Sequence, residues 1–486
     1  MSISFNAIPI DIRTPGHYIE IDNSRAVQGL PAIHHKILVI GQRLAAGTMA
    51  AGVPKLITSK GQAEEYFGRG SMLSAMFNAL KGVNSYTESW GIALDDLGAG
   101  VAATGSIAFS GTVTDSGTLN IYIGGTAVKV GVTAGQATTA IATAVAAAIA
   151  ADTSLPVTAT AATSTVTVTA RHKGVCGNDI DLRLNYYQGE VTPKGLVATI
   201  TAMASGTGNP DIATAITAMG DEQYHTIIMP YTDAANLAAL ETTLSQRFGP
   251  MVQKEGHAFA AAAGSHATIS TLGDTRNSPH LTIVGAQYSP TPPWIIAAVV
   301  GAVDAYEPDP ARPRQTLPLT GVLPPAPEKR YTLSERNIHL HDGISTYIVD
   351  AGGNCLVERL ITTYKTNAFG VEDISYLDVE TMRTVAYLRY SVRTRIALKF
   401  PRYKLANDGT NFGPGQAIVT PKIIRAELIA LFLLWEDSGL AENIEQFKRD
   451  LIVERNTTDP NRVDAVIPPD VINQFRVFAA AVQFRL

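Results

Sequence analysis

The clearest pattern of hydrophobic and polar positions lies at the end of the chain. Apolar side chains fall on every second residue there, and a period of two is the pattern of a β-strand. The positions that share this face are Phe478, Ala480, Val482, Phe484 and Leu486. A hydrophobic strand at a chain end usually either pairs within its own domain or adds to the sheet of a neighbouring molecule.

A similar segment lies near the start of the chain. Tyr18, Ile19, Glu20 and Ile21 follow a polar lead that contains prolines, and they also alternate in character. Two strand-bearing ends therefore flank a large globular body. This arrangement favours a chain that is joined to copies of itself, and we expect these two segments to be the intersubunit strands.

Between the ends, the pattern predicts an α/β beginning and then a β-rich insertion. After an N-terminal arm (residues 1–30), residues 31–97 contain a buried strand at 37–41 and a helix that Ser59 would cap. Residues 98–206 are poor in charge, and alternating positions on both sides of Gly124 and Gly125 predict a hairpin. We expect an inserted, mostly β domain here. The alternative is a flexible low-complexity segment, and the regular alternation argues against it.

The second half of the chain predicts a layered α/β domain followed by helices. Short apolar strands alternate with helices over residues 207–370, which favours a parallel sheet. The proline-rich residues 307–327 are expected to be an extended traverse. In the C-terminal domain (residues 371–470), Asp378 and Thr420 are the expected starts of two helices, and residues 471–486 form the arm strand. The fold class is thus an α/β multi-domain protein.

Composition narrows the functional classes. A chain of 486 residues should hold several domains, and its net charge of -5 gives no reason to expect nucleic acid as the main partner. Cys176 and Cys355 are the two cysteines, so no disulfide framework is expected, and synthesis in a reducing compartment is favoured. The first residues lack the pattern of a signal peptide, and the apolar runs are too short or too interrupted to cross a bilayer.

Two groups of residues raise the question of chemistry. The segment His339-Leu340-His341-Asp342 could offer metal ligands, because alternate residues of a strand face the same way. No second cluster of Cys or His lies near it in sequence, however, and a surface strand followed by a turn is the preferred interpretation. A serine hydrolase would draw on His257, Ser265, His266, Asp274 and His280. The Gly-x-Ser-x-Gly elbow is absent from the sequence, so we predict no catalytic, metal or cofactor site.

A run of basic residues is the remaining candidate site. Its members, with no acidic residue between Glu380 and Asp408, are Arg383, Arg389, Arg393, Arg395, Lys399, Arg402 and Lys404. Arg389 and Arg393 are four residues apart and so share a helix face. This face is either simply solvated or a positive patch that meets an acidic protein surface, and nucleic acid is the third alternative.

Both ends of the chain resemble one known family. The segments ISFNAIP (residues 3–9), TPGHYIE (14–20) and DNSRA (22–26) look like the start of Mu-like phage contractile tail sheath proteins. The segments TDPNRVD (458–464) and PPDVINQFRVF (468–478) look like the end of the same family. The resemblance covers both termini and agrees with the domain order between them.

The resemblance implies a structural subunit of a contractile tail sheath, made in the bacterial host cytoplasm and located in the virion tail. Such subunits stack as six-membered rings in a helix around an inner tail tube, and contraction drives the tube through the host envelope. Implied partners are copies of the chain, the tube protein, and the baseplate and tail terminator proteins, with no nucleic acid and no membrane insertion. The implied α/β core is subtilisin-like but acts as a scaffold without proteolysis.

The resemblance also assigns roles to the segments singled out above. The arms are expected to complete a sheet in the C-terminal domain of an adjacent subunit, and the inserted β domain is expected to face outward. The arginine-rich helix face is a candidate contact with the tube. The alternatives are another phage tail component, from the baseplate or the tube, and, more distantly, a subtilisin-like hydrolase.

Overall fold

The computed structural model describes residues 13–19, 29–413 and 415–485. Glu20, Ile21 and Leu486, which belong to the predicted arm strands, lie outside the described residues. The chain divides into two compact units. The α/β unit contains residues 35–308 and 314–379, and the C-terminal unit contains the described parts of 1–34 and 380–486 together with residues 309–313.

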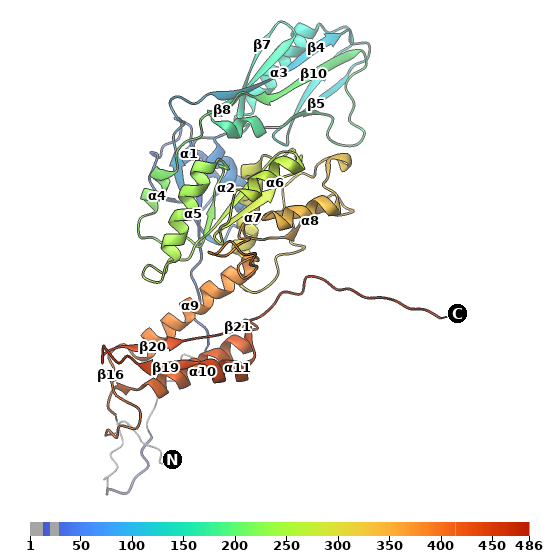
Figure 1. The fold of residues 1–486 in the computed structure, drawn as a ribbon. Coiled ribbons are helices and arrows are strands. Elements are labelled where there is room, and N and C mark those ends of the chain that lie inside the picture. The colour runs from blue at the N-terminus through green and yellow to red at the C-terminus, as the bar shows by residue number, and fades with distance from the viewer. Residues whose placement is uncertain (1–12, 20–28, 414, 486) are drawn as a thin grey trace. The chain divides into compact units, whose positions relative to one another are not determined.

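An eight-stranded sheet organises the α/β unit (Figure 1). The six inner strands are parallel to their neighbours, and each edge carries an antiparallel strand. In spatial order the strands are β15 (Cys355–Arg359), β14 (Ile344–Val349), β13 (Leu281–Gly285), β12 (His257–Ala262), β11 (Thr226–Ile228), β1 (Lys36–Gln42), β3 (Glu88–Leu94) and β2 (Lys55–Leu56). Strands β11, β12 and β13 are buried along their whole length, which explains their nearly continuous apolar sequence.

Helices between the strands complete this unit. They are α1 (Lys60–Phe67), α2 (Met72–Val83), α4 (Ala213–Met219), α5 (Ala234–Phe248), α6 (His266–Asp274), α7 (Pro293–Tyr306) and α8 (Leu333–His341). The predicted cap is confirmed, because the Ser59 side chain accepts a hydrogen bond from the Gln62 backbone N–H at the start of α1. Helix α7 is apolar on nearly all sides because it packs against α2, β11 and β12.

The β-rich insertion forms two antiparallel sheets around one helix. The elements are β4 (Ala102–Gly111), β5 (Gly117–Ile123), β6 (Thr126–Val132), α3 (Thr138–Ala151), β7 (Val157–Ala162), β8 (Thr165–Lys173), β9 (Leu182–Leu184) and β10 (Leu196–Ala204). One sheet has the order β10-β4-β8-β7 and the other β6-β5-β9, and α3 packs against strands of both. Gly124 and Gly125 form the predicted hairpin turn, and both have the positive φ that favours glycine there. The buried side chains of the whole insertion belong to the same apolar cluster as those of the eight-stranded sheet.

The C-terminal unit is mainly helical and has short strands. Its elements are α9 (Val379–Lys399), β16 (Lys404–Leu405), β17 (Ile418–Val419), α10 (Pro421–Asp437), β18 (Ala441–Glu442), α11 (Ile444–Asp450), β19 (Ile452–Arg455), β20 (Val463–Val466) and β21 (Asp470–Val471). Thr420 caps α10 as predicted. The rings of Phe432 and Phe447 stack at 4.2 Å beside the buried Trp435. The indole N–H of Trp435 donates to the Ser391 hydroxyl at 2.9 Å and so ties α10 to α9.

One local prediction was wrong. The segment that contains His339 and His341 is helix α8, not a surface strand, and His339 is fully buried. Thr332 and Glu335 form a complete capping box at the start of this helix. The Thr-x-x-Glu pattern of this capping box is visible in the sequence. It outweighs the alternation of His339 and His341, because the two side chains satisfy two backbone N–H groups at the helix start that would otherwise lack partners.

Candidate assembly surfaces

The C-terminal tail is an extended segment that follows β21. After β21, residues 473–485 form no helix and no strand. Phe478, Val482 and Phe484 are 80%, 89% and 79% exposed. Figure 1 shows this tail running out from β21 to the C-terminal label. The predicted strand therefore has no partner among the described residues of its own domain, and pairing with a neighbour stays a prediction.

The tail is held at its root by a buried ion pair. Arg476 Nη2 lies 2.9 Å from Glu380 Oε2 in the first turn of α9, and the Glu380 side chain is fully buried. Just before this ion pair in the sequence, β21 pairs with β18, and the Ile472 backbone N–H donates to Leu440 O at 3.2 Å. The tail is thus attached up to Arg476, and the exposed apolar alternation begins directly beyond it.

The N-terminal segment is also attached to α9. The hydroxyl groups of Tyr387 and Tyr390 donate to the carbonyl oxygens of Pro31 and Ala32, at 3.1 and 3.2 Å. Ile19, in the described part of the predicted arm strand, is 88% exposed. No local pattern in the sequence indicated that one helix anchors both arms, because the partners are more than three hundred residues apart in one case and nearly one hundred in the other.

A hairpin with open edges lies in the same unit. Strands β19 and β20 pair with each other, and no other strand of the described chain joins them. Ile452 and Val466 face each other across the ladder and are 53% and 57% exposed. Backbone groups at an open strand edge and an exposed apolar pair are the features that a donated strand requires.

The structure separates the four predicted patch arginines. Arg395 forms an ion pair with Glu427 of α10, and Lys399 Nζ lies 3.1 Å from the other oxygen of that carboxylate. Arg383 and Arg389 are half-buried, whereas Arg393 is exposed, and its guanidinium carbon lies 5.8 Å from the centre of the Tyr390 ring. Arg395 therefore contributes to packing of α9 on α10, and Arg393 is the patch residue that projects most into solvent.

The candidate hydrolase residues are not arranged as a triad. Ser265 is the N-cap of α6, and its hydroxyl accepts from the Thr268 backbone N–H at 3.2 Å. Asp274 is the last residue of the same helix, roughly 14 Å from Ser265 along the helix axis. His257 is 3% exposed within the sheet and shares a 2.8 Å hydrogen bond with the Thr282 hydroxyl. The serine thus has a structural role at a helix start.

A histidine pair was not foreseen. His266 Nδ1 and His339 Nε2 lie 2.6 Å apart and join α6 to α8, with the Tyr331 ring edge-on to His339 at 4.9 Å. Burial lowers the pKa of His339, so the neutral form of this imidazole is favoured. Within the described ranges, no group of three or more His, Cys, Asp and Glu side chains is placed to hold a metal ion.

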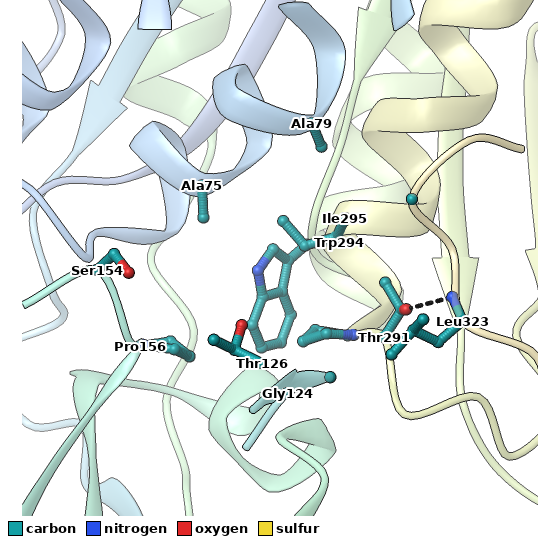
Figure 2. Close-up of a pocket in the computed structure, with 13 residues that line it drawn as sticks. Ala75, Ala79, Gly124, Thr126, Ser154, Pro156, Thr291, Trp294, Ile295 and Leu323 are labelled. Carbon is teal, nitrogen blue, oxygen red and sulfur yellow. Dashed lines mark hydrogen bonds between the residues drawn. The ribbon is translucent and has the colours of Figure 1, made fainter. Parts of the chain in front are cut away.

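One small cavity lies where the inserted hairpin meets α2 and α7 (Figure 2). Its volume is about 270 Å³, and Figure 2 shows the Trp294 indole in the middle of the lining residues. No charged side chain lines it. The lining residues are Ala75, Ala79, Gly124, Gly125, Thr126, Ser154, Pro156, Thr291, Pro292, Trp294, Ile295, Gly321 and Leu323.

In the described parts of the chain, no helix has the length and apolar character needed to cross a membrane.

Similar structures support the overall fold. A sheath tail protein from Listeria innocua matches with a TM-score of 0.51 and 13% identity, over 93% of this chain and 94% of that one. The helical sheath of the anti-feeding prophage in its contracted state matches with a TM-score of 0.50 and 12% identity, over 97% and 99%. The mixed α/β multi-domain fold is therefore that of tail sheath structures.

Sequence comparison establishes the family. Residues 205–363 match the phage tail sheath protein central domain, and residues 371–485 match the phage tail sheath C-terminal domain. The chain is 47% identical over 488 aligned positions to the Mu-like prophage FluMu tail sheath protein of Haemophilus influenzae, and the alignment covers 100% of both proteins. The chain therefore belongs to the family of Mu-like phage tail sheath proteins, as the resemblance of its two ends predicted.

Proposed function

We propose that this sheath protein polymerises around an inner tail tube as six-membered rings stacked in a helix, and that contraction drives the tube through the host envelope for genome delivery. Family membership supports the sheath role, and the fold shared with a contracted helical sheath supports a helical assembly. The observation that carries the proposal is the exposed apolar stretch of residues 477–485, which follows the anchor at Arg476 and forms no strand among the described residues.

The tail and the hairpin are complementary. We infer that the tail of one subunit adds to the open edge of β19–β20 in a neighbour and that the N-terminal arm, with Tyr18, Ile19, Glu20 and Ile21, adds to the same small sheet. Backbone hydrogen bonds supply affinity in such strand addition, and alternate side chains supply register. Because the extended chain between the anchor and the donated strand acts as a connector, subunit bodies can slide and rotate during contraction while the donated strands stay paired.

The remaining parts take supporting roles in this proposal. The unit built on the eight-stranded sheet is a rigid subtilisin-like scaffold; its mostly parallel sheet is compatible with that fold, and Ser265 is used as a helix cap. We infer a structural and not an enzymatic role, because fold alone does not supply chemistry. The insertion (residues 98–206) lies outside the matched family domains except for its last two residues, and we propose that it faces outward.

Partners beyond the chain itself follow from the sheath role. The inner tube protein, the baseplate and the tail terminator are the proposed contacts, in a virion tail assembled in the host cytoplasm. For the tube contact we propose the helix face that contains Arg389 and Arg393. Electrostatic attraction there would set orientation more than affinity.

The first experiment removes residues 477–486 from the full chain. The side chains of residues 477–485 are exposed, so the variant should fold, with an unchanged circular dichroism spectrum and an unchanged melting temperature of the unit that contains Trp435. We expect no cylinders by negative-stain electron microscopy under conditions where the intact chain forms them. Val482→Lys should have the same effect, whereas Gln483→Lys on the other strand face is the matched control. Normal cylinders from the truncated chain would refute the arm mechanism.

A second experiment addresses the tube contact. Arg389→Glu and Arg393→Glu together should prevent sheath from assembling on co-expressed tube protein while leaving tube-free cylinders intact. Reversal of Arg449, which is 70% exposed on α11, is the control for a general charge effect. Extended sheath that still surrounds the tube in the double variant would exclude this helix face as the tube contact.

A further inference from the structure

The two faces of the β19–β20 hairpin differ in character. Successive side chains of a strand point to opposite faces, so each face of the hairpin carries four residues. One face, here called the inner face, consists of Val453, Arg455, Val463 and Ala465. The other, here called the outer face, consists of Ile452, Glu454, Asp464 and Val466. Strand β19 packs on α10, and Val453 contacts the apolar core of the C-terminal unit, so the inner face is the one turned toward that core.

The outer face holds two carboxylates opposite each other. Glu454 and Asp464 are direct neighbours across the ladder, and like charges in this arrangement are destabilising. Asp464 is compensated within the hairpin, because Asn456 Nδ2 donates to one of its oxygens at 2.6 Å and Arg462 Nε lies 2.5 Å from the other. Glu454 is exposed, and within the described ranges of the chain no side chain pairs with its carboxylate. The outer face therefore has a carboxylate that a cation of another chain can reach.

The strand segment of the tail carries one charged side chain. Within residues 477–486 this is Arg485, and it is exposed. Alternation places Arg485 on the strand face opposite to Val482 and Phe484. The tail's other arginine, Arg476, is already held in the buried ion pair at the root. A donated strand from this tail therefore has one apolar face and one face that ends in a cation.

The faces of the tail and of the hairpin match in one orientation. A strand that adds to a sheet edge continues both faces of the sheet, because side chains of neighbouring strands line up across the ladder. The apolar face of the tail belongs on the inner face, where its area is removed from water. The opposite orientation would turn Phe484 toward solvent and Arg485 toward the apolar core, where an unpaired charge is costly. The favoured orientation brings Arg485 to the outer face, which carries Glu454.

We propose that Arg485 of one copy of this chain forms an ion pair with Glu454 of a neighbouring copy and that this pair fixes the register of the donated strand. A slip by one residue turns the apolar face outward, but a slip by two residues leaves it inward, so apolar burial alone does not exclude it. A slip by two residues does separate the two charges. The added cation also relieves the repulsion between Glu454 and Asp464.

The inference rests on the proposed strand donation and names the residues that set its register. Charge pairs at an interface contribute more to specificity and register than to affinity. An exposed ion pair also contributes little free energy by itself. Exchange of the charges between the two positions is therefore a sharper test than removal of one charge.

Charge reversals in the full chain provide this test. Arg485→Glu and Glu454→Lys each bring like charges together, so each should raise the critical concentration for cylinder formation about threefold or more. A chain with both substitutions restores the pair and should return to within about twofold of the unmodified chain. Asp437→Lys, the same charge change at an exposed position of α10, is the control and should shift the value by less than about twofold. If the double variant assembles no better than the single variants, the two residues do not pair.

Thermal stability separates this role from a structural one. Glu454→Lys removes the like-charge pair from the hairpin, so the melting temperature of the C-terminal unit should not fall although assembly is weakened. A residue that only supports the hairpin would lower stability and assembly together. A lower melting temperature in Glu454→Lys would therefore assign Glu454 to folding of the hairpin and overturn the proposal.

Cross-linking detects the contact directly. Arg485→Lys keeps the positive charge and should assemble as the unmodified chain does. Carbodiimide joins an amine to a carboxylate in contact with it, so mass spectrometry should find links from position 485 to Glu454. A mixture of isotope-labelled and unlabelled chains shows that these links are intermolecular. Cylinders of this variant without such links overturn the proposed register while leaving the sheath function in place.

A different result marks failure of the proposed function. If the unmodified chain forms no cylinder or ring at any concentration, self-assembly has failed. The carbodiimide reaction of Arg485→Lys then decides the contact alone in concentrated solution, where intermolecular links to Glu454 support it and their absence refutes it.

Discussion

The sheets of the two units of this protein differ in how their edge strands are paired. In the α/β unit, six parallel strands lie between antiparallel edge strands, and β11 to β13 are buried throughout. In the described part of the C-terminal unit, each sheet has two strands, and the longest strands have four residues. An isolated two-stranded hairpin is at best marginally stable. The first unit therefore completes its own sheet, whereas the second leaves hydrogen-bonding edges for another chain.

The difference identifies where stability and assembly are located. Apolar side chains of the tail stay exposed because no surface of their own unit covers them, although the Trp435 core nearby is fully buried. Apolar area removed from water is the main favourable term in association. The apolar area of the anchored arm is buried only when a neighbouring subunit is present, so its favourable free energy contributes to polymerisation and not to folding of the subunit. Folding and polymerisation are therefore separate steps.

The largest effect should come from the core of the C-terminal unit. Trp435→Ala removes a fully buried indole and its hydrogen bond to Ser391, so the free energy of unfolding of this unit should fall by about 3–5 kcal/mol. Phe259→Ala, in β12, is the matched change in the α/β unit. Scanning calorimetry should show each variant lowering the transition of its own unit. If both variants lower one shared transition equally, the units do not fold independently.

A smaller effect is expected at the root of the tail. Glu380→Ala leaves the Arg476 guanidinium without its carboxylate, and the free energy of unfolding of the C-terminal unit should fall by about 1–3 kcal/mol. Limited proteolysis should then cut near residue 476 faster. Glu445→Ala removes a carboxylate that is 82% exposed and should change neither measurement. An unchanged cleavage rate in Glu380→Ala would show that the ion pair does not hold the arm.

Acidification should weaken the α/β unit more than the C-terminal unit through His339. Burial lowers its pKa in the folded state, so below the unfolded pKa of about 6.5 the unfolded chain binds the proton more readily. Stability is therefore lost as the pH falls below that value. Melting curves from pH 8 to pH 5 should show a smaller loss for His339→Asn than for the unmodified protein. Identical pH profiles would remove His339 as a cause.

The smallest effect should follow Arg395→Ala. Glu427, the partner of Arg395, still pairs with Lys399 after this substitution, and the Arg395–Glu427 ion pair is only partly buried. The free energy of unfolding should therefore fall by about 0.5–1 kcal/mol. Arg393→Ala, on the exposed side of α9, is the control for stability and should have almost no effect. If both substitutions cost the same, Arg395 does not act by pairing α9 with α10.

Local patterns predicted most of the elements. The strands at β11, β12 and β13, the caps of α1 and α10, the hairpin at Gly124 and the proline-rich traverse all follow from neighbouring residues, and the structure has them where they were predicted. The error at His339 arose because two alternating histidines were weighed without the capping box of Thr332 and Glu335. The family was evident from the two ends of the chain, where short motifs are specific.

What the sequence determined by itself is therefore the kind of each element, the exposed apolar alternation of the C-terminal arm and the family. Hydrogen-bonding geometry and side-chain periodicity act over a few residues, so they can be read along the chain. Only the tertiary structure decided that α9 anchors both arms, that Arg395 pairs with Glu427, and that His266 meets His339. Each of these contacts joins residues that are distant in sequence, and packing of whole elements brings them together.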